Sequence, residues 1–168
     1  ELHDHPRLAA ARDALEQALD EVRRLGHDLN SDLWEHRSLA DAICAEAERI
    51  ERATRIRVHY QMEGNPPQTD PDTSVVLYRV FQLTLANAIK HSGADRISIS
   101  LSCAPDDSRP VISIHDNGRG FDQHATTPHA GLVNIHKRCA LIGYMATCTS
   151  TPSTGCQWII QPHEHHAA

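Results

Sequence analysis

The sequence predicts one α+β domain, a two-layer α/β sandwich in which helices cover a mixed, mostly antiparallel sheet, with an additional helical segment at the N-terminus. Helical and strand patterns alternate along the chain in the order helix, helix, strand, helix, strand, strand, loop, helix, strand, strand. The 168 residues suffice for a core that needs no disulfide or metal. Hydrophobic residues make up 40% and charged residues 23%, which excludes a mostly disordered chain.

Charge and cysteine content indicate which partners and which cellular compartment to expect. The net charge is −6, so we expect no nucleic-acid partner. The cysteines are odd in number, widely spaced and without a C-x-x-C pair, which favours reduced thiols and a cytoplasmic location. They are Cys44, Cys103, Cys139, Cys148 and Cys156. The run Cys139–Pro162 lacks charged residues but is too rich in Thr, Ser, Pro and Gly for a membrane span, so we expect no membrane contact from this segment.

The first predicted helix covers Pro6 to about Leu29. Its apolar residues recur at alternating three- and four-residue steps, the pattern of a coiled coil or helical bundle. A stripe of about four heptads cannot be buried by one helix, so a partner helix is implied. We therefore separate residues 1–32 from the domain at residues 33–168.

The domain begins with a helix, a strand and a second, longer helix. The periodicity predicts a helix at Ser38–Thr54, a strand at Ile56–Tyr60 and a helix from Asp70 to about Lys90. The last of these has apolar residues around most of its circumference, with Leu83 counted in the core, and should be the most buried helix.

Alternating polar and apolar residues predict two antiparallel strands at Ile97–Leu101 and Val111–His115, joined by a polar loop at Ala104–Pro110. The Gly-, Thr- and His-rich stretch from Gly118 to about Ala130 is expected to be a mobile loop.

The C-terminal part predicts a helix followed by two more strands. The helix covers about Leu132–Ile142 and ends at Gly143, a typical C-cap residue. The strands are expected at Tyr144–Ser150 and Cys156–Gln161, on either side of a turn at Pro152–Gly155.

Three segments carry candidate chemistry, and the first closes the most buried helix. The carboxamide oxygen of Asn87 could bind Mg²⁺, a hard cation that prefers oxygen ligands, with Lys90 and His91 facing anionic oxygens. Alternatively, Asn87 caps a neighbouring loop and the Lys-His end is simply solvated.

The second segment, Asp116–Phe121, directly follows a predicted strand. Asp116 could accept a hydrogen bond from an amino group such as that of adenine, and Gly118 and Gly120 would let the backbone approach a flat ring. Alternatively, Asn117-Gly118 forms a type I′ hairpin turn, which this dipeptide favours.

The third segment, Ala130-Gly131-Leu132, opens the last helix. The free N–H groups and the dipole at a helix start attract anions, so Gly131 and Leu132 could receive phosphates. Alternatively, Gly131 is a plain N-cap.

Together these segments resemble the ATP-binding domain of two-component sensor histidine kinases, within the wider group that includes gyrase-type ATPases and anti-sigma kinases. The likeness is strongest to the nitrate-sensor-like class. Leu77–Ala94 resembles its N box, Asp116–Asp122 its G1 box and Gly131–Gly143 its G2 helix, with a short lid between the last two. Upstream, Glu21–Leu29 resembles the second helix of the dimerisation hairpin.

The resemblance implies the Bergerat fold, ATP and Mg²⁺ as ligands, and a role for each matching residue. These are Asn87 for Mg²⁺, Lys90 and His91 near the phosphates, Asp116 for the adenine amine, Gly118 and Gly120 in the adenine wall, and Gly131 and Leu132 at the phosphates. It also implies transfer of the γ-phosphoryl group to a histidine and then to a response regulator. The domain at residues 33–168 would bind ATP, and residues 1–32 would help to form a homodimer.

The sequence departs from this family at three positions. Leu83 replaces the N-box acid that stands four residues before the Asn, His129 replaces the first Gly of the G2 box, and Cys156 replaces a Thr near the final turn. Leu cannot accept a proton, and Cys is a weaker hydrogen-bond partner than Thr. A second hypothesis is therefore a catalytically impaired nucleotide-binding or scaffold module of the same fold that regulates a partner.

Histidines raise two further hypotheses. His3 lies in Glu1–Asp4, which spells the start of the family's phospho-acceptor motif, although only one predicted helix separates it from the ATP-binding domain. The tail cluster of His163, His165 and His166 allows a metal-binding hypothesis, although a terminal cluster of this kind is more simply incidental tail composition.

Overall fold

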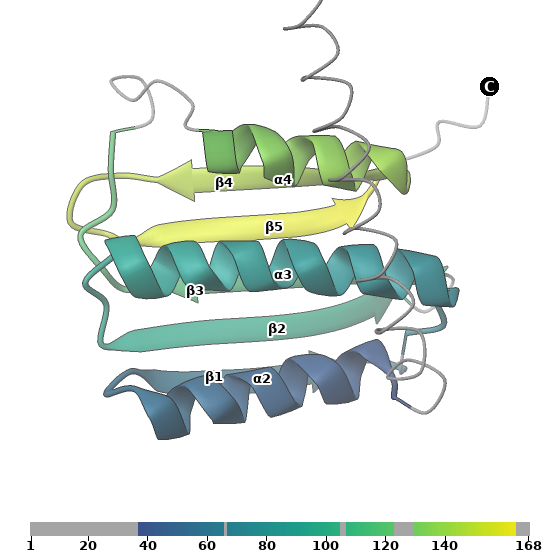
Figure 1. Cartoon of the computed structure of the whole chain (residues 1–168), viewed down its shortest axis with the longest axis horizontal. Coiled ribbons are helices and arrows are strands. Elements are labelled where there is room, and N and C mark those ends of the chain that lie inside the picture. Colours follow the sequence, from purple (N-terminus) through teal and green to yellow (C-terminus); the bar gives the residue numbers. More distant parts are fainter. Residues whose placement is uncertain (1–36, 66, 105–106, 123–129, 164–168) are drawn as a thin grey trace, which may run out of the picture. The chain divides into compact units, whose positions relative to one another are not determined.

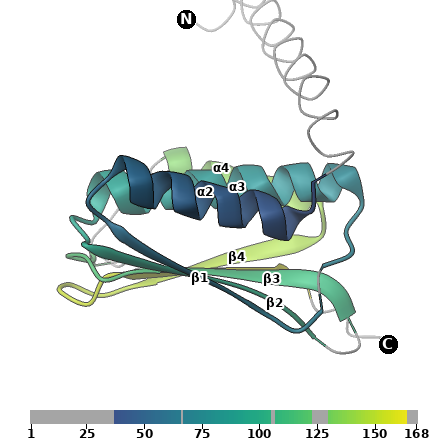
Figure 2. The same ribbon diagram turned by 90° about the horizontal axis from the view of Figure 1, so that it is seen from below.

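The computed structural model describes residues 37–163 except residues 66, 105–106 and 123–129. Within these residues it contains three helices and five strands. The helices form one layer and the sheet forms the other, with the helices covering one face of the sheet (Figure 2). The predicted α+β two-layer sandwich is confirmed. The predicted helix at Pro6–Leu29 lies outside the described residues.

The three helices begin and end close to their predicted limits. They are α2 (Leu39–Ala53), α3 (Pro71–His91) and α4 (Ala130–Leu141). The N-caps explain two of the starts: the Ser38 side chain accepts from the Asp41 amide at 3.1 Å, and Asp70 accepts from the Thr73 amide at 2.9 Å. Hydrogen bonding from Thr73 also lowers the pKa of Asp70.

The five strands form one mixed sheet (Figure 1). They are β1 (Arg57–Glu63), β2 (Arg96–Ala104), β3 (Asp107–Asp116), β4 (Tyr144–Ser150) and β5 (Cys156–Pro162). Their order is β1-β2-β3-β5-β4, with β1 and β2 parallel and every other pair antiparallel. Helix α2 contacts β1 and α4 contacts β4, while α3 contacts both other helices and lies between them.

The core lies between the layers and is built mainly from α3 and the inward positions of β2, β3 and β5. Its largest fully buried side chains include Leu77, Phe81, Leu85, Ile97, Ile99, Leu101, Ile112, Ile114 and Ile160. The prediction that Leu83 belongs to this core is wrong, because its side chain is 37% exposed. Its buried neighbours Phe81, Thr84 and Leu85 occupy the sheet-facing side of α3, and the helical spacing turns Leu83 away from them.

Strands β2 and β3 are longer than predicted, and the expected loop at Ala104–Pro110 is wrong over most of its length. Cys103 pairs with Pro110, and Ala104 pairs with Asp107 after a register shift. The segment contains too many polar residues to show an alternating pattern, although the buried Pro110 continues the inward positions of β3. Arg109 contributes to this end by binding the Asp107 carboxylate at 2.7 Å.

Two prolines mark the same end of the sheet between β3 and β5. The register pairs Ile112 with Ile160, and continuing it by two residues would place Pro110 opposite Pro162. Neither proline has a backbone N–H group to donate, and the β3–β5 pairing ends at Ile112 and Ile160.

Candidate functional site

Four parts of the chain that are distant in sequence meet at one end of the sandwich. The C-terminus of α3, the end of β3, the β4–β5 turn and the start of α4 all lie at the left of Figure 1. Asn87, Lys90 and His91 belong to the last turns of α3, and Gly131 and Leu132 to the first turn of α4. The structure therefore brings the three candidate segments to this end.

The side chains at the end of α3 are accessible. Asn87 is partly buried, while Lys90 and His91 are exposed. Within the described residues the Asn87 carboxamide has no hydrogen-bond partner, so the structure gives no support to the loop-capping alternative. Residues three and four positions apart are neighbours on a helix surface, so Asn87 shares one face of α3 with Lys90 and His91.

The end of α3 is packed directly against the loop that follows β3. The Arg119 amide donates to the Ser92 carbonyl at 2.8 Å, and the Arg119 Nε donates to the His91 carbonyl at 2.9 Å. These bonds satisfy carbonyl groups that a helix C-terminus leaves without intrahelical partners. A Cβ atom at Gly118 would lie 2.4 Å from the Ser92 carbonyl oxygen, so only glycine permits this approach.

Asp116 places a buried carboxylate at the start of this loop. It is 3% exposed, and its Oδ1 accepts a hydrogen bond from the Gly118 amide at 3.0 Å. No described residue donates to its Oδ2. The Oδ2 atom is therefore available to accept from a donor on a ligand, such as an amino group.

Asn117 is a positioning residue that the sequence interpretation missed. Its Oδ1 accepts from the amides of Asp95 and Arg96 at 3.2 and 3.0 Å, and its Nδ2 donates to the Asp95 carboxylate at 2.8 Å. This last bond lowers the pKa of Asp95. The type I′ turn hypothesis is wrong, since it requires positive φ at both central residues and neither Asn117 nor Gly118 has it. The Asn-Gly dipeptide gave no signal for the observed role.

The β4–β5 turn supports the other side of the loop. Gly120 has a φ of +59°, and a Cβ atom there would lie 2.0 Å from the Thr151 carbonyl oxygen. Gly155 has a φ of +85°, and a Cβ atom there would lie 1.8 Å from the Asp116 carbonyl oxygen. Both glycines are needed because backbone packs against backbone.

Ser150 links this turn to the loop through its buried hydroxyl. The hydroxyl accepts from the Phe121 amide at 2.9 Å and donates to the Gly155 carbonyl at 2.8 Å. Next to it, Cys156 pairs with Ser150 on β4 and with Asp116 on β3. A serine within an alternating strand looks ordinary in sequence, so this role could not be predicted.

Helix α4 begins at Ala130, so Gly131 lies within its first turn and is not its N-cap. The plain N-cap alternative is therefore wrong, and the N–H groups of this turn lie at the site's edge. His3, His129, His165 and His166 lie outside the described residues, so their hypotheses remain predictions.

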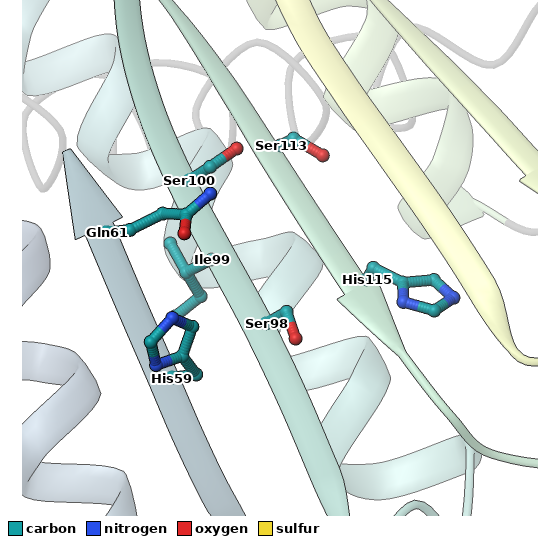
Figure 3. Close-up of a pocket in the computed structure, with 7 residues that line it drawn as sticks. All are labelled: His59, Gln61, Ser98, Ile99, Ser100, Ser113 and His115. Atoms are coloured by element: carbon teal, nitrogen blue, oxygen red, sulfur yellow. The ribbon is translucent and has the colours of Figure 1, made fainter. Parts of the chain in front are cut away.

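The described part of the chain contains no group of three His, Cys, Asp or Glu side chains placed to bind a metal. None of its helices has the length and apolarity needed to span a membrane. A shallow open pocket lies on the uncovered face of the sheet, where Figure 3 shows His59 and His115 with Gln61 and several serines. This pocket shares no residue with the candidate site.

Comparison with known proteins adds independent findings. Residues 72–165 match the family model described as histidine kinase-, DNA gyrase B-, and HSP90-like ATPase. Sensor histidine kinase MctS of Rhizobium johnstonii is 31% identical over 110 residues, covering 66% of this chain and 23% of its own length. The kinase/phosphatase DegS of Brevibacillus brevis is 25% identical over 150 residues, covering 89% and 38%. The chain thus spans well under half of these relatives.

Solved structures of low sequence identity share the fold. The histidine kinase domain of the blue-light activated kinase EL346 from Erythrobacter litoralis has a TM-score of 0.60 at 18% identity, covering 74% of this chain and 61% of that one. Histidine kinase AdeS from Acinetobacter baumannii has a TM-score of 0.58 at 15% identity, covering 96% and 86%.

Proposed function

The chain belongs to the family of histidine kinase-, DNA gyrase B- and HSP90-like ATPases, and from this premise we propose that residues 33–168 are the ATP-binding catalytic domain of a two-component sensor histidine kinase. The complete protein would transfer the γ-phosphoryl group of ATP to a histidine and then to a response regulator. The single observation that carries this proposal is the buried Asp116 carboxylate, held in a loop that hydrogen bonds to the end of α3.

The adenine end of the site is assigned to the loop after β3. Asp116 Oδ1 is already used by the Gly118 amide, and Oδ2 would accept from the adenine amine. Gly118 and Gly120 would form the wall against the ring with their backbone, which can pack closely against Ser92 and Thr151 because neither residue has a side chain. Asn117 would fix this loop by its bonds to Asp95 and Arg96.

The phosphate end is assigned to α3 and α4. The Asn87 carboxamide fits Mg²⁺, which takes one or two protein oxygens and fills its remaining positions with phosphate and water. Lys90 and His91 on the same face would lie near the phosphates, and the first turn of α4, with Gly131 and Leu132, would receive them. Bound Mg·ATP supplies the transferable phosphoryl group, and such transfer depends on positioning and charge stabilisation.

One position limits the chemistry. Leu83 lies one turn before Asn87 on the same face of α3 and is 37% exposed, so it faces solvent where an acid would act as a base or orient a nucleophile. We therefore propose that the domain binds Mg·ATP and that its phosphotransfer is weakened. This position is also the observation that favours the second candidate, a nucleotide-binding scaffold that regulates a partner.

The remaining assignments follow from the same proposal. Residues 1–32 would form part of a dimerisation hairpin and make the protein a homodimer. The domain would work in the cytoplasm, as a soluble protein or as the cytoplasmic part of a membrane-attached sensor.

A titration with a fluorescent ATP analogue, with and without Mg²⁺, tests the binding function. We expect a saturable signal that tightens when Mg²⁺ is added. The Asn87→Ala variant should lose the Mg²⁺ effect and keep binding without the metal, while Asn65→Ala, at an exposed site elsewhere, should match the unmodified protein. The absence of a saturable signal under both conditions would overturn ATP binding and leave only a scaffold role.

A further inference from the structure

Two cysteines on neighbouring strands lie in direct contact beside the candidate site. The Sγ atoms of Cys148 on β4 and Cys156 on β5 are 3.3 Å apart. We propose that these residues form a reversible intramolecular disulfide on exposure to a hydroperoxide, and that this bond weakens nucleotide binding. The disulfide is a modification site that does not depend on the proposed function. Its effect on nucleotide binding rests on the proposed function.

The contact is specific to this pair among the five cysteines, all of which lie in the described residues. No disulfide joins any of them. Cys139 is fully buried, and burial raises its pKa to about 11. The Cys103 thiol lies near the Ser108 carbonyl at 3.5 Å, at the opposite end of β2 from the site. Only Cys148 and Cys156 have sulfur atoms in contact.

The surroundings of the two thiols assign them different roles. Cys156 is buried, and its pKa is raised by hydrogen bonding with Cys148 and by burial, so it keeps its proton at neutral pH. When the Cys156 thiol is the donor in this contact, its hydrogen bond stabilises negative charge on the Cys148 sulfur. Cys148 is partly exposed and is therefore the thiol that a peroxide reaches first.

The oxidation balances with a hydroperoxide as the two-electron oxidant. The Cys148 sulfur attacks the terminal peroxide oxygen, the O–O bond breaks, and a sulfenic acid forms while the alcohol or water leaves with the thiol proton. The Cys156 sulfur then attacks the sulfenic sulfur, the S–S bond forms, and the hydroxyl leaves as water with the Cys156 proton. Two thiols are oxidised and one peroxide is reduced.

The strand register explains why this bond would be easily reversed. Cys148 pairs with Trp158 and Cys156 pairs with Ser150, so the cysteines are diagonal neighbours. Diagonal Cα atoms are about 7–8 Å apart in a sheet, whereas disulfides prefer at most about 6.8 Å. The strands must therefore move closer by roughly 1 Å, and a strained disulfide is readily reduced.

That movement would act on the proposed adenine end. Cys156 is the partner of Asp116 across β3 and β5, and Gly155 lies against the Asp116 carbonyl. Ser150, opposite Cys156, holds the Phe121 amide. A shift of β5 toward β4 would pull on both contacts that support the loop.

Peptide mapping after peroxide treatment tests the bond itself. Chymotryptic cleavage after Tyr144 and Trp158 isolates Cys148 and Cys156 without Cys139. We expect this peptide to lose two hydrogens in mass after treatment with hydrogen peroxide and to regain them with dithiothreitol. Cys148→Ser should abolish the change and Cys103→Ser should not. Retention of both thiols, or a bond to another cysteine in their place, would overturn the proposal.

Nucleotide titration of the reduced and oxidised protein tests the consequence. We expect oxidation to weaken binding of the fluorescent ATP analogue at least fivefold, with recovery on reduction and no change in Cys148→Ser. Equal affinity in both forms would overturn the coupling. If the reduced protein does not bind the analogue, the proposed function is wrong. Amide hydrogen exchange at residues 116–121 then tests whether the disulfide affects the loop after β3. Exchange rates that oxidation leaves unchanged would overturn the proposed effect on the loop.

Discussion

The Arg119 amide donates a hydrogen bond to the Ser92 carbonyl at 2.8 Å, which joins the loop after β3 to the residue that follows α3. The side chain of Arg119 strengthens the joint by binding the His91 carbonyl at 2.9 Å. Residues proposed to bind adenine and residues proposed to bind phosphate are therefore held at a fixed separation before any ligand arrives. Such preorganisation reduces the ordering cost of binding.

Gly118→Ala should damage this joint. The added methyl group would lie 2.4 Å from the Ser92 carbonyl oxygen, and neither backbone can move cheaply. We expect a loss of about 1–3 kcal/mol in the free energy of unfolding, measured by urea denaturation, together with loss of ATP-analogue binding. Gly143→Ala is the control: its φ is +70° with nothing within 4 Å, so it should lose stability and keep binding. Normal binding by Gly118→Ala would contradict the proposed adenine wall.

Asp116→Asn should weaken binding of the ATP analogue by tenfold or more, about 1.4 kcal/mol. The amide can still accept from the Gly118 amide with its oxygen, but it then presents an NH₂ group to the adenine amine, donor against donor. The control is the preceding residue, since His115 points to the opposite face of the sheet and is exposed. His115→Asn should bind normally, and equal affinities for the two variants would remove Asp116 from the site.

Asn117→Asp should make stability depend on pH. In the unmodified protein Asn117 lowers the pKa of Asp95, so this stabilisation is present above the ordinary pKa and is lost as the pH falls through the lowered value. In the variant two carboxylates face each other, and the loss in free energy of unfolding should be larger at pH 7 than at pH 4, where one of them binds a proton. The double variant Asn117→Asp with Asp95→Asn restores one amide and one carboxylate, and urea denaturation should show recovery at pH 7. A loss independent of pH would show that the pair does not interact.

Leu83→Glu should increase phosphotransfer in protein that carries the acceptor helices. Leu83 is 37% exposed, so a glutamate there stays hydrated and should change the free energy of unfolding by less than about 0.5 kcal/mol. Leu83→Gln has a similar shape without a proton-accepting carboxylate and serves as the control. Radiolabelled phosphate transfer from ATP measures the effect, and equal rates for all three proteins would show that Leu83 is not the cause of weak transfer.

The three described helices, α2, α3 and α4, were well predicted because their signals are local. Ser38 and Asp70 begin α2 and α3 as N-caps, and Gly143 follows α4 with a φ of +70°. Each of these signals depends on a few consecutive residues. The extension of β2 past Leu101 and of β3 before Val111 was missed, since it depends on which strand lies opposite.

The residues of the candidate site could be named from the sequence, whereas the contacts that support them could not. Asp116 and the glycines follow from motifs, whereas the link from Ser150 to Phe121 and the contact between Cys148 and Cys156 depend on the β4–β5 register. Leu83 was wrongly assigned to the core for a different reason. Hydrophobicity alone does not show which apolar residue of a nearly all-apolar helix faces away from the sheet.

The positions of Pro110 and Pro162 determine the end from which strands β3 and β5 should separate first. The two prolines have no amide donors, and the paired region of β3 and β5 runs from Ile112 and Ile160 to Asp116 and Cys156 at the other end. Fraying should therefore begin at the proline end and reach the loop after β3 last, so that deuterium uptake spreads along β3 from residue 111 toward residue 116.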